Sequence, residues 1–284
     1  MSSTAEISER GARGNPERAP VTVREVIGEV FITLGVLLLL FAFYEAFWTN
    51  ITSGELQEEA QQQLDDEWRN PRTKHLPGMG EAFAQLYIPA FGSDYSYAVL
   101  EGTDDDTLLA GLGHYTDSQM PDEPGNFALA GHRVGKGAPF NDLGHLNVCD
   151  AIVVETQNQW FTYRVLPMEE GAEGRTAASQ SCLRGPLLDD VAHGRYAHVL
   201  GRHITLPTDT SVLAPLPEAP ESGAAAAGEK DKLGRVITLT TCHPQFSNAE
   251  RMIIHAVQTD ARDKSAGPPP ALTGGGGAQS GEGK

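Results

Sequence analysis

Residues 238–244 read Thr-Leu-Thr-Thr-Cys-His-Pro, and the interpretation of the whole fold starts from this stretch. With Val236 and Ile237 in front of it, the segment has the β-branched and apolar residues that are typical of a buried strand. Proline cannot continue the hydrogen-bond ladder, so we expect the strand to end at His243. Cys242 therefore lies at the carboxyl end of a strand, where a side chain is held rigidly and still faces a cleft.

Two further segments bring candidate partners for a thiol to strand ends. A second strand is expected from Arg251 to Ala256, and if the two strands pair, Arg251 lies at the same sheet end as Cys242. Upstream, residues 125–132 predict a strand that ends in Gly-His, which brings His132 to a strand end as well. A thiol needs a proton partner to act as a nucleophile, and its acyl chemistry needs a positive group near the oxyanion.

Each of these residues has a competing interpretation. A single cysteine in a strand is more often a small buried apolar residue, and only its two companions favour chemistry for Cys242. His243 is the rival base because it adjoins Cys242, but successive strand residues point to opposite faces, so His132 is preferred. The competing cations are Arg133, which directly follows His132 and should point away from the cleft, and Arg202, which no motif supports.

The three motifs together resemble the sortase family of cysteine transpeptidases. The family's order is matched by Ala-Gly-His ending at His132, by Leu-Thr-Thr-Cys ending at Cys242, and by Arg251 nine residues later. The Gly-Ala-Pro-Phe run at 137–140 and the Cys-His-Pro run resemble the class E sortases of actinobacteria. The resemblance covers about residues 86–257 and implies an all-β fold, an eight-stranded barrel with short helices.

The resemblance also implies a reaction. Cys242 as a thiolate attacks the carbonyl carbon of a Thr–Gly bond in an LAxTG-type sorting signal, His132 protonates the leaving amine, and Arg251 stabilises the oxyanion. An amine of a peptidoglycan precursor then resolves the thioester. The implied substrate-binding residues are Thr241 and Tyr115, although a loop tyrosine can equally pack its ring on the barrel. The implied partners are secreted proteins with a C-terminal sorting signal and the peptidoglycan amine; no metal or organic cofactor is called for.

Two other functions would use the same residues. With water in place of the amine, Cys242, His132 and Arg251 would form a cysteine peptidase that hydrolyses the signal. A barrel that only binds peptides in the cell envelope is the second alternative, and the intact set of three residues argues against it. Product analysis with and without an amine distinguishes the peptidase from the transpeptidase. Labelling of Cys242 by a peptide-like electrophile distinguishes an enzyme from a protein that only binds peptides.

Composition restricts the partners and the role of the other cysteines. The formal net charge is −17 over 284 residues, which argues against nucleic acid or anionic lipid as the principal partner. Three cysteines without a CxxC motif do not favour a disulfide framework. Cys149 and Cys182 are interpreted as buried or incidental residues, although they could pair in an oxidising exterior.

An apolar run near the N-terminus predicts a membrane anchor. Residues 30–44 carry no charge, and their flanks extend the run to about the 20 residues that a ~30 Å hydrocarbon core requires. Four arginines precede the run and the next basic residue is Arg69, so the positive-inside rule predicts a cytoplasmic N-terminus and an extracellular catalytic domain. The alternatives are a buried core helix and a cleaved signal peptide, and bulky residues after the run disfavour the latter.

Composition divides the chain into a disordered cytoplasmic tail (1–24), a transmembrane signal-anchor helix (25–48), an extracellular stalk (49–80), the catalytic domain (81–262) and a disordered Gly/Pro-rich tail (263–284). Ser53 is predicted to cap a solvated stalk helix with a narrow apolar stripe, which could rest on the domain. Asp104 and its acidic neighbours favour a helix cap over a calcium loop.

The pattern inside the domain predicts strands at 86–89, 97–100, 151–156, 159–165 and 203–206, a loop at 111–124, an insertion of unknown role at 168–199, and a flexible loop at 218–232. The position of the last loop, just before the cysteine strand, resembles the loop that shapes the sorting-signal site in sortases.

Overall fold

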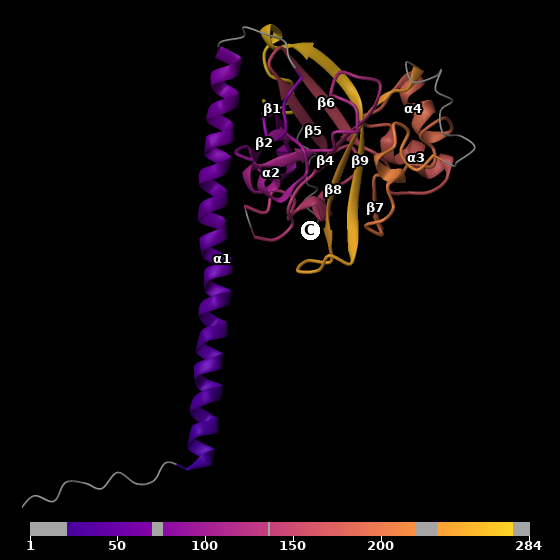
Figure 1. Cartoon of the computed structure of the whole chain (residues 1–284). Helices are drawn as coiled ribbons and strands as arrows, with labels where there is room; N and C mark the ends of the chain where they lie inside the picture. Colours follow the sequence, from indigo (N-terminus) through magenta and orange to yellow (C-terminus); the bar gives the residue numbers. More distant parts are fainter. Residues whose placement is uncertain (1–21, 70–75, 136, 220–231, 275–284) are drawn as a thin grey trace, which may run out of the picture. The chain divides into compact units, whose positions relative to one another are not determined.

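The computed structural model describes residues 22–69, 76–135, 137–219 and 232–274, and Figure 1 shows the whole chain. The chain consists of two units, Met1–Glu45 and Ala46–Lys284, which are described separately. Nearly all of the predicted N-terminal tail and most of the predicted flexible loop lie outside the described residues.

Helix α1, Val23–Arg69, begins in the first unit and ends in the second. Its segment Val23–Tyr44 is long and apolar enough to cross a membrane, with a mean hydropathy of 2.5. The predicted helix start at Ser53 is wrong, because α1 passes through this residue without a break. The Ser53 hydroxyl instead donates to the Leu109 carbonyl at 2.7 Å, which satisfies a serine inside a helix.

Within the second unit, the apolar stripe of α1 packs against strands of the sheet. Leu64 and Ala60 are buried in one cluster with Ala82, Ala98 and Leu100. Side chains with a spacing of four residues lie along one side of a helix, so Ala60 and Leu64 face the sheet together.

The second unit is built on one sheet that closes into a barrel (Figure 1). The strand order is β6-β5-β1-β2-β3-β4-β8-β9, and the barrel closes because β6 also pairs with β9. The eight-stranded barrel that the resemblance implied is therefore confirmed. A further strand, β7, pairs with the first part of β9.

The strand bounds are β1 Ala82–Tyr87, β2 Ser96–Glu101, β3 Leu112–His114, β4 Gly125–Ala130, β5 Ala151–Thr156, β6 Gln159–Val165, β7 Arg202–Thr205, β8 Arg235–His243 and β9 Glu250–Asp263. The short helices are α2 Asp105–Ala110, α3 Ala172–Ser179 and α4 Gly185–Ala192.

Alternation along β8 and β9 decides which side chains reach the core. Ile237 and Leu239 of β8, together with Met252 and Ile254 of β9, belong to the main hydrophobic core inside the barrel. Because successive strand residues point to opposite faces, the side chains between them lie on the outer face of the barrel wall. Cys242 has this outward parity.

Two local predictions are confirmed. Strands β5 and β6 form the expected antiparallel hairpin, with Ala151 opposite Arg164. Asp104 caps α2 by accepting a hydrogen bond from the Thr107 amide at 3.1 Å. These backbone and side-chain hydrogen bonds lower the pKa of the Asp104 carboxyl, so the acidic run is used as a helix cap.

The predicted loop at 111–124 is wrong in its first part, which forms β3. This strand pairs parallel with β2 and antiparallel with β4. It has only three residues, Leu-Gly-His, and a run of this length has no readable alternation. Its place in the sheet is set by its neighbours.

The insertion at 168–199 contains α3 and α4, which contact each other. Arg175 of α3 is fully buried and donates to the carbonyls of Val191, Tyr196 and Val199, each at 2.9 Å. A buried guanidinium with several acceptors holds the carboxyl end of α4 and the turn that follows it in place.

Cys149 and Cys182 form a disulfide, which corrects their interpretation as buried or incidental residues. Their Cα atoms lie 5.7 Å apart, within the range that a disulfide requires. The bond joins the turn before β5 to the segment between α3 and α4, so the insertion is covalently attached to the barrel.

The predicted C-terminal tail contains defined structure in its first part. Lys264 begins a short 3₁₀ helix, and its Nζ lies 2.7 Å from Glu155 Oε1 and 3.7 Å from the centre of the Trp68 ring. The turns continue to Gly274, and residues 275–284 lie outside the described part of the chain.

Candidate active site

The predicted nucleophile and the predicted cation lie opposite each other at one end of the sheet. Cys242, near the end of β8, pairs in register with Arg251, near the start of β9. Both residues are half-buried, and Cys242 is the free cysteine of the described residues. Since neighbouring strands lie about 4.8 Å apart, the long arginine side chain can reach a group bound at the thiol.

His132 follows β4, which runs parallel to β8. Ala130 pairs with Thr240, and two further contacts continue this pairing: the Gly131 amide donates to the Thr240 carbonyl at 3.1 Å, and the Thr241 hydroxyl donates to the Gly131 carbonyl at 2.8 Å. Extension of this register by one more residue brings His132 level with Cys242. The three predicted catalytic residues therefore belong to one end of the adjacent strands β4, β8 and β9.

Close packing explains why a glycine stands at position 131, just before His132. A Cβ at Gly131 would lie 2.6 Å from the Phe140 ring and 2.8 Å from a Leu112 methyl group, which is closer than real Cβ contacts. The Phe140 amide in turn donates to the His132 carbonyl at 3.0 Å. The Gly-His pair and the Pro-Phe pair are thus two parts of one packed turn that fixes the backbone of the histidine.

The hairpin loop between β8 and β9 adds a residue that the sequence analysis missed. The Cys242 thiol donates to Asn248 Oδ1 at 3.4 Å, and Arg251 Nη1 contacts the Asn248 carbonyl at 3.5 Å and the Glu250 carbonyl at 3.0 Å. Asn248 therefore contacts both the thiol and the guanidinium. The sequence offered one signal for Asn248: it lies six residues after the cysteine, in the loop between two paired strands.

The rival base and one rival cation contact each other. Arg133 Nη1 lies 2.6 Å from His243 Nδ1 and donates to the Cys242 carbonyl at 3.2 Å. Thr241 and His243 share one parity of β8, and Cys242 has the other. His243 therefore contacts the Arg133 guanidinium, and its side chain lies on the strand face opposite to the Cys242 thiol.

Arg202, the other rival cation, is committed elsewhere. Its Nη1 donates to the carbonyls of Gly144 and Leu146. These contacts attach the start of β7 to the short 3₁₀ segment Leu143–His145.

The two predicted substrate-binding residues differ in their surroundings. The Tyr115 hydroxyl lies 2.9 Å from Thr240 Oγ1, on the face of β8 that carries Cys242 two residues later. Thr241 is only 3% exposed, and its hydroxyl is committed to the Gly131 carbonyl. This contact favours a positioning role for Thr241, because the hydroxyl attaches the end of β4 to β8. Candidate metal ligands gather away from the thiol, at His203, Glu218 and His255.

Comparison with known proteins shows that the chain is similar to members of one described family. A family model described as the sortase domain matches residues 86–259. Sortase SrtE1 of Streptomyces coelicolor is 35% identical over 273 residues, an alignment that covers 93% of this chain and 65% of that relative. Sortase SrtE2 of the same organism is 30% identical over 282 residues, with 92% and 94% covered.

Among solved structures, the SrtF sortase from Corynebacterium diphtheriae matches with a TM-score of 0.65 and 52% identity, covering 72% of this chain and 97% of that one. The chain spans slightly less than two thirds of the length of SrtE1, and nearly all of SrtE2. The relatives named SrtE1 and SrtE2 confirm the class E resemblance that the sequence motifs indicated.

Proposed function

The chain belongs to the sortase family, whose members are cysteine transpeptidases, and from this premise we propose that Cys242 is the nucleophile of a membrane-anchored transpeptidase. The in-register pairing of Cys242 with Arg251 is the observation that supports this assignment most strongly. His132, at the end of the strand on the other side of β8, is the proposed general acid and base.

The first half-reaction transfers an acyl group to the enzyme. The Cys242 thiolate attacks the carbonyl carbon of the Thr–Gly bond, and the guanidinium of Arg251 stabilises the oxyanion of the tetrahedral intermediate. The C–N bond then breaks, His132 donates its proton to the leaving glycine amine, and a thioester remains on Cys242.

The second half-reaction releases the product. An amine of a peptidoglycan precursor attacks the thioester carbonyl while His132, now neutral, takes the proton of the amine. The C–S bond breaks and the thiolate of Cys242 is restored. Sortases act on sorting signals in general, and the class resemblance favours an LAxTG-type signal for this chain. Tyr115, which contacts Thr240 near the thiol, is a proposed contact of the bound peptide.

Asn248 has a proposed role in the ionisation of the thiol. Its side-chain oxygen, Oδ1, accepts a hydrogen bond from the protonated thiol, but the same oxygen would repel a thiolate. Rotation of the amide would instead direct its NH₂ group at the sulfur, and an amide donor stabilises the charged form. We therefore assign Asn248 as a positioning residue that follows the protonation state of Cys242.

The proposed location is the cell membrane, with the catalytic domain outside and the N-terminus in the cytoplasm. The apolar segment Val23–Tyr44 supports a single span, and the arginines before it support this orientation. Secreted proteins would meet an enzyme anchored in this way as they leave the membrane.

A fluorogenic peptide panel tests the proposed function. Peptides with LAxTG, LPxTG and NPxTG signals are incubated with the full chain in detergent, with and without an amine acceptor. We expect preferred cleavage of LAxTG and an amine-linked product when the acceptor is present, with no turnover by Cys242→Ala. If the hydrolysed peptide is still the only product when the amine is present, the protein is a peptidase and not a transpeptidase. If Cys242→Ala cleaves the peptide as well as the parent does, Cys242 is not the nucleophile.

A further inference from the structure

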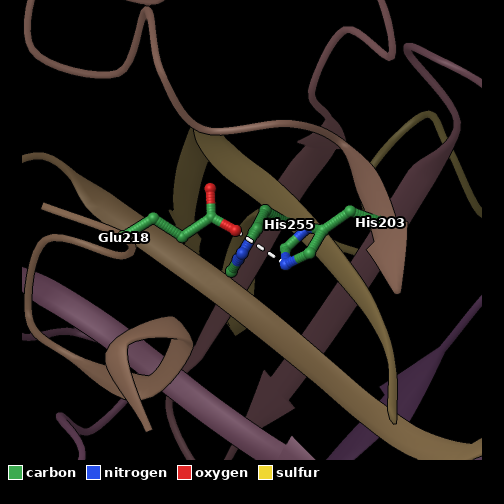
Figure 2. Close-up of side chains that lie close together, drawn as sticks. All are labelled: His203, Glu218 and His255. Carbon is green, nitrogen blue, oxygen red and sulfur yellow. Dashed lines mark ion pairs between the residues drawn. The ribbon is translucent and has the colours of Figure 1, made fainter. Parts of the chain in front are cut away.

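Three potential ligands gather on the outer face of the barrel wall, away from Cys242. His203 comes from β7, His255 from β9, and Glu218 from the segment between β7 and β8 (Figure 2). One ligand atom from each residue lies within 4.8 Å of the other two. The residues are far apart in the sequence, so their spacing alone could not reveal them as a group.

The hydrogen bonds around His255 determine which of its ring nitrogens is available. The Asn126 amide nitrogen donates to the carbonyls of Val212 and Ala214, at 3.0 and 3.1 Å, so its Oδ1 must point the other way. The Thr238 hydroxyl lies 2.7 Å from this Oδ1 and must donate to it. Thr238 Oγ1 is then left as an acceptor for His255 Nδ1–H, 2.9 Å away.

It follows that His255 carries its proton on Nδ1 and a lone pair on Nε2. His255 is fully buried, and its Nε2 has no hydrogen-bond partner among the described residues. Burial, with nearby His203 and His198 as smaller causes, lowers the pKa of His255 to about 3, so the ring is neutral at neutral pH. A buried lone pair without a donor is costly, and it requires an explanation.

The other two members lie close to the His255 ring. The rings of His203 and His255 stack with their centres 5.5 Å apart, and His203 Nε2 lies 2.6 Å from Glu218 Oε1 (Figure 2). The side chains of His203 and Glu218 are only 17% and 23% exposed. His198 is also near His255, but its ring nitrogens do not belong to the group of gathered ligand atoms, and its Nε2 contacts the Pro217 carbonyl at 3.0 Å.

We propose that His203, Glu218 and His255 bind a first-row divalent cation of the zinc class. Two imidazoles and one carboxylate are the ligands that Zn²⁺ and its neighbours favour, whereas Ca²⁺ and Mg²⁺ prefer sites made of oxygen alone. His255 already has the outer hydrogen bond, from Nδ1–H to Thr238, that orients metal-bound histidines. Three protein ligands leave the fourth tetrahedral position for water.

A bound ion would connect β7, β9 and the segment that carries Glu218. It would hold Glu218, just before the undescribed residues 220–231, against strands β7 and β9. An ion that binds the folded chain and not the unfolded chain raises the melting temperature in proportion to the logarithm of its concentration. The site is separate from Cys242, so its existence does not depend on the proposed reaction.

The test uses the full chain in detergent, without a polyhistidine tag and with Cys242→Ala so that the thiol cannot bind metal. Co²⁺ is titrated and followed by the visible absorption of a tetrahedral site, and the melting temperature is measured with ZnCl₂. We expect one equivalent of Co²⁺ and a higher melting temperature with Zn²⁺. His203→Gln and Glu218→Gln should each weaken binding by at least about tenfold, as loss of supporting groups around metals does.

His193→Gln is the matched control. His193 is an exposed histidine 3.3 Å from the carboxylate of Asp189, so it offers the same pair of groups without the buried third ligand. This variant should bind Co²⁺ like the parent, and near-ultraviolet circular dichroism verifies that each variant is folded. Absence of stoichiometric binding by the parent, or binding by folded His203→Gln and Glu218→Gln equal to the parent, would show that the three residues form only a hydrogen-bonded cluster.

Discussion

Arg251 pairs with Cys242, and its proposed role is to stabilise the oxyanion that forms there. Arg251→Ala should lower the rate of acyl-enzyme formation by about 10²–10³, the range for removal of one oxyanion donor. Arg251→Lys should restore only part of this loss, because an ammonium lacks the planar fork of donors. The measurement is single-turnover acylation with a sorting-signal peptide.

Thermal melts separate this role from a structural one, since Arg251 also donates to the carbonyls of Glu250 and Asn248. An Arg251→Ala protein that melts lower and acylates at the parental rate would rule out the catalytic role and leave an arginine that only supports the hairpin.

Asn248 provides a second prediction, about ionisation. Asn248→Asp places a negative charge beside the thiol, which disfavours the thiolate, so alkylation by iodoacetamide should require a higher pH than in the parent. Asn248→Ala removes the contact without adding charge and should move the alkylation profile less. If Asn248→Asp leaves the profile unchanged, the loop residue does not face the thiol in solution.

The placement of the three proposed catalytic residues at neighbouring strand ends was predictable because their signals are local. A proline marks the end of β8 next to Cys242, and strand alternation separates Cys242 from His243. Asn248 was missed because its loop has no regular pattern. The metal ligands were missed for another reason, since His203 and His255 meet only through the pairing of β7 with β9.

The disulfide between Cys149 and Cys182 acts on whole elements. It closes a loop of 33 residues that contains β5, β6 and α3, and a loop of this length is worth about 3–4 kcal/mol in the chain-entropy account. The double variant Cys149→Ser/Cys182→Ser should therefore unfold at clearly lower denaturant concentration, while its acylation rate stays near that of the parent. The use of serine avoids a thiol reductant, which would attack the thioester on Cys242 as a competing nucleophile.

Chemical denaturation of the folded double variant checks this expectation. A loss of less than about 1 kcal/mol would mean that the bond adds little beyond the packing of α3 and α4, against the chain-entropy account. The pair escaped prediction because sequence separation carries no information on the distance between two Cα atoms. The β5–β6 hairpin was predictable, since both segments are rich in β-branched and aromatic residues and a short turn joins them, whereas the closed eight-stranded barrel was implied by the resemblance to sortases.

At the scale of the whole molecule, the proposed anchoring places the two ends of α1 on opposite sides of the membrane. Protease added to intact protoplasts should remove the chain after the apolar segment Val23–Tyr44 and spare the N-terminal tail. The reason is the arginine asymmetry, since translocation of basic residues is disfavoured. Protection of the catalytic domain until the membrane is dissolved would contradict the outward orientation.

The continuity of α1 was not predictable from its sequence, because Ser53 and Gly54 are typical of a helix start. Burial of Ser53 and its hydrogen bond to Leu109 compensate for the weak local preference. Where contacts far along the chain override local preference, as in α1 and β3, a single sequence cannot reveal the result.

We propose that Cys242, served by His132, carries the acyl group. The most direct measurement is the intact mass of the full chain after reaction with a sorting-signal peptide, for the parent and for Cys242→Ala, His132→Ala and His243→Ala. We predict that the parent carries an adduct of the acyl fragment and that an amine removes it. Cys242→Ala should carry no adduct, and His132→Ala almost none. His243→Ala should carry a nearly normal adduct, because the His243 imidazole of the parent contacts Arg133. An adduct that persists in Cys242→Ala, or one that depends on His243 and not on His132, would contradict the account.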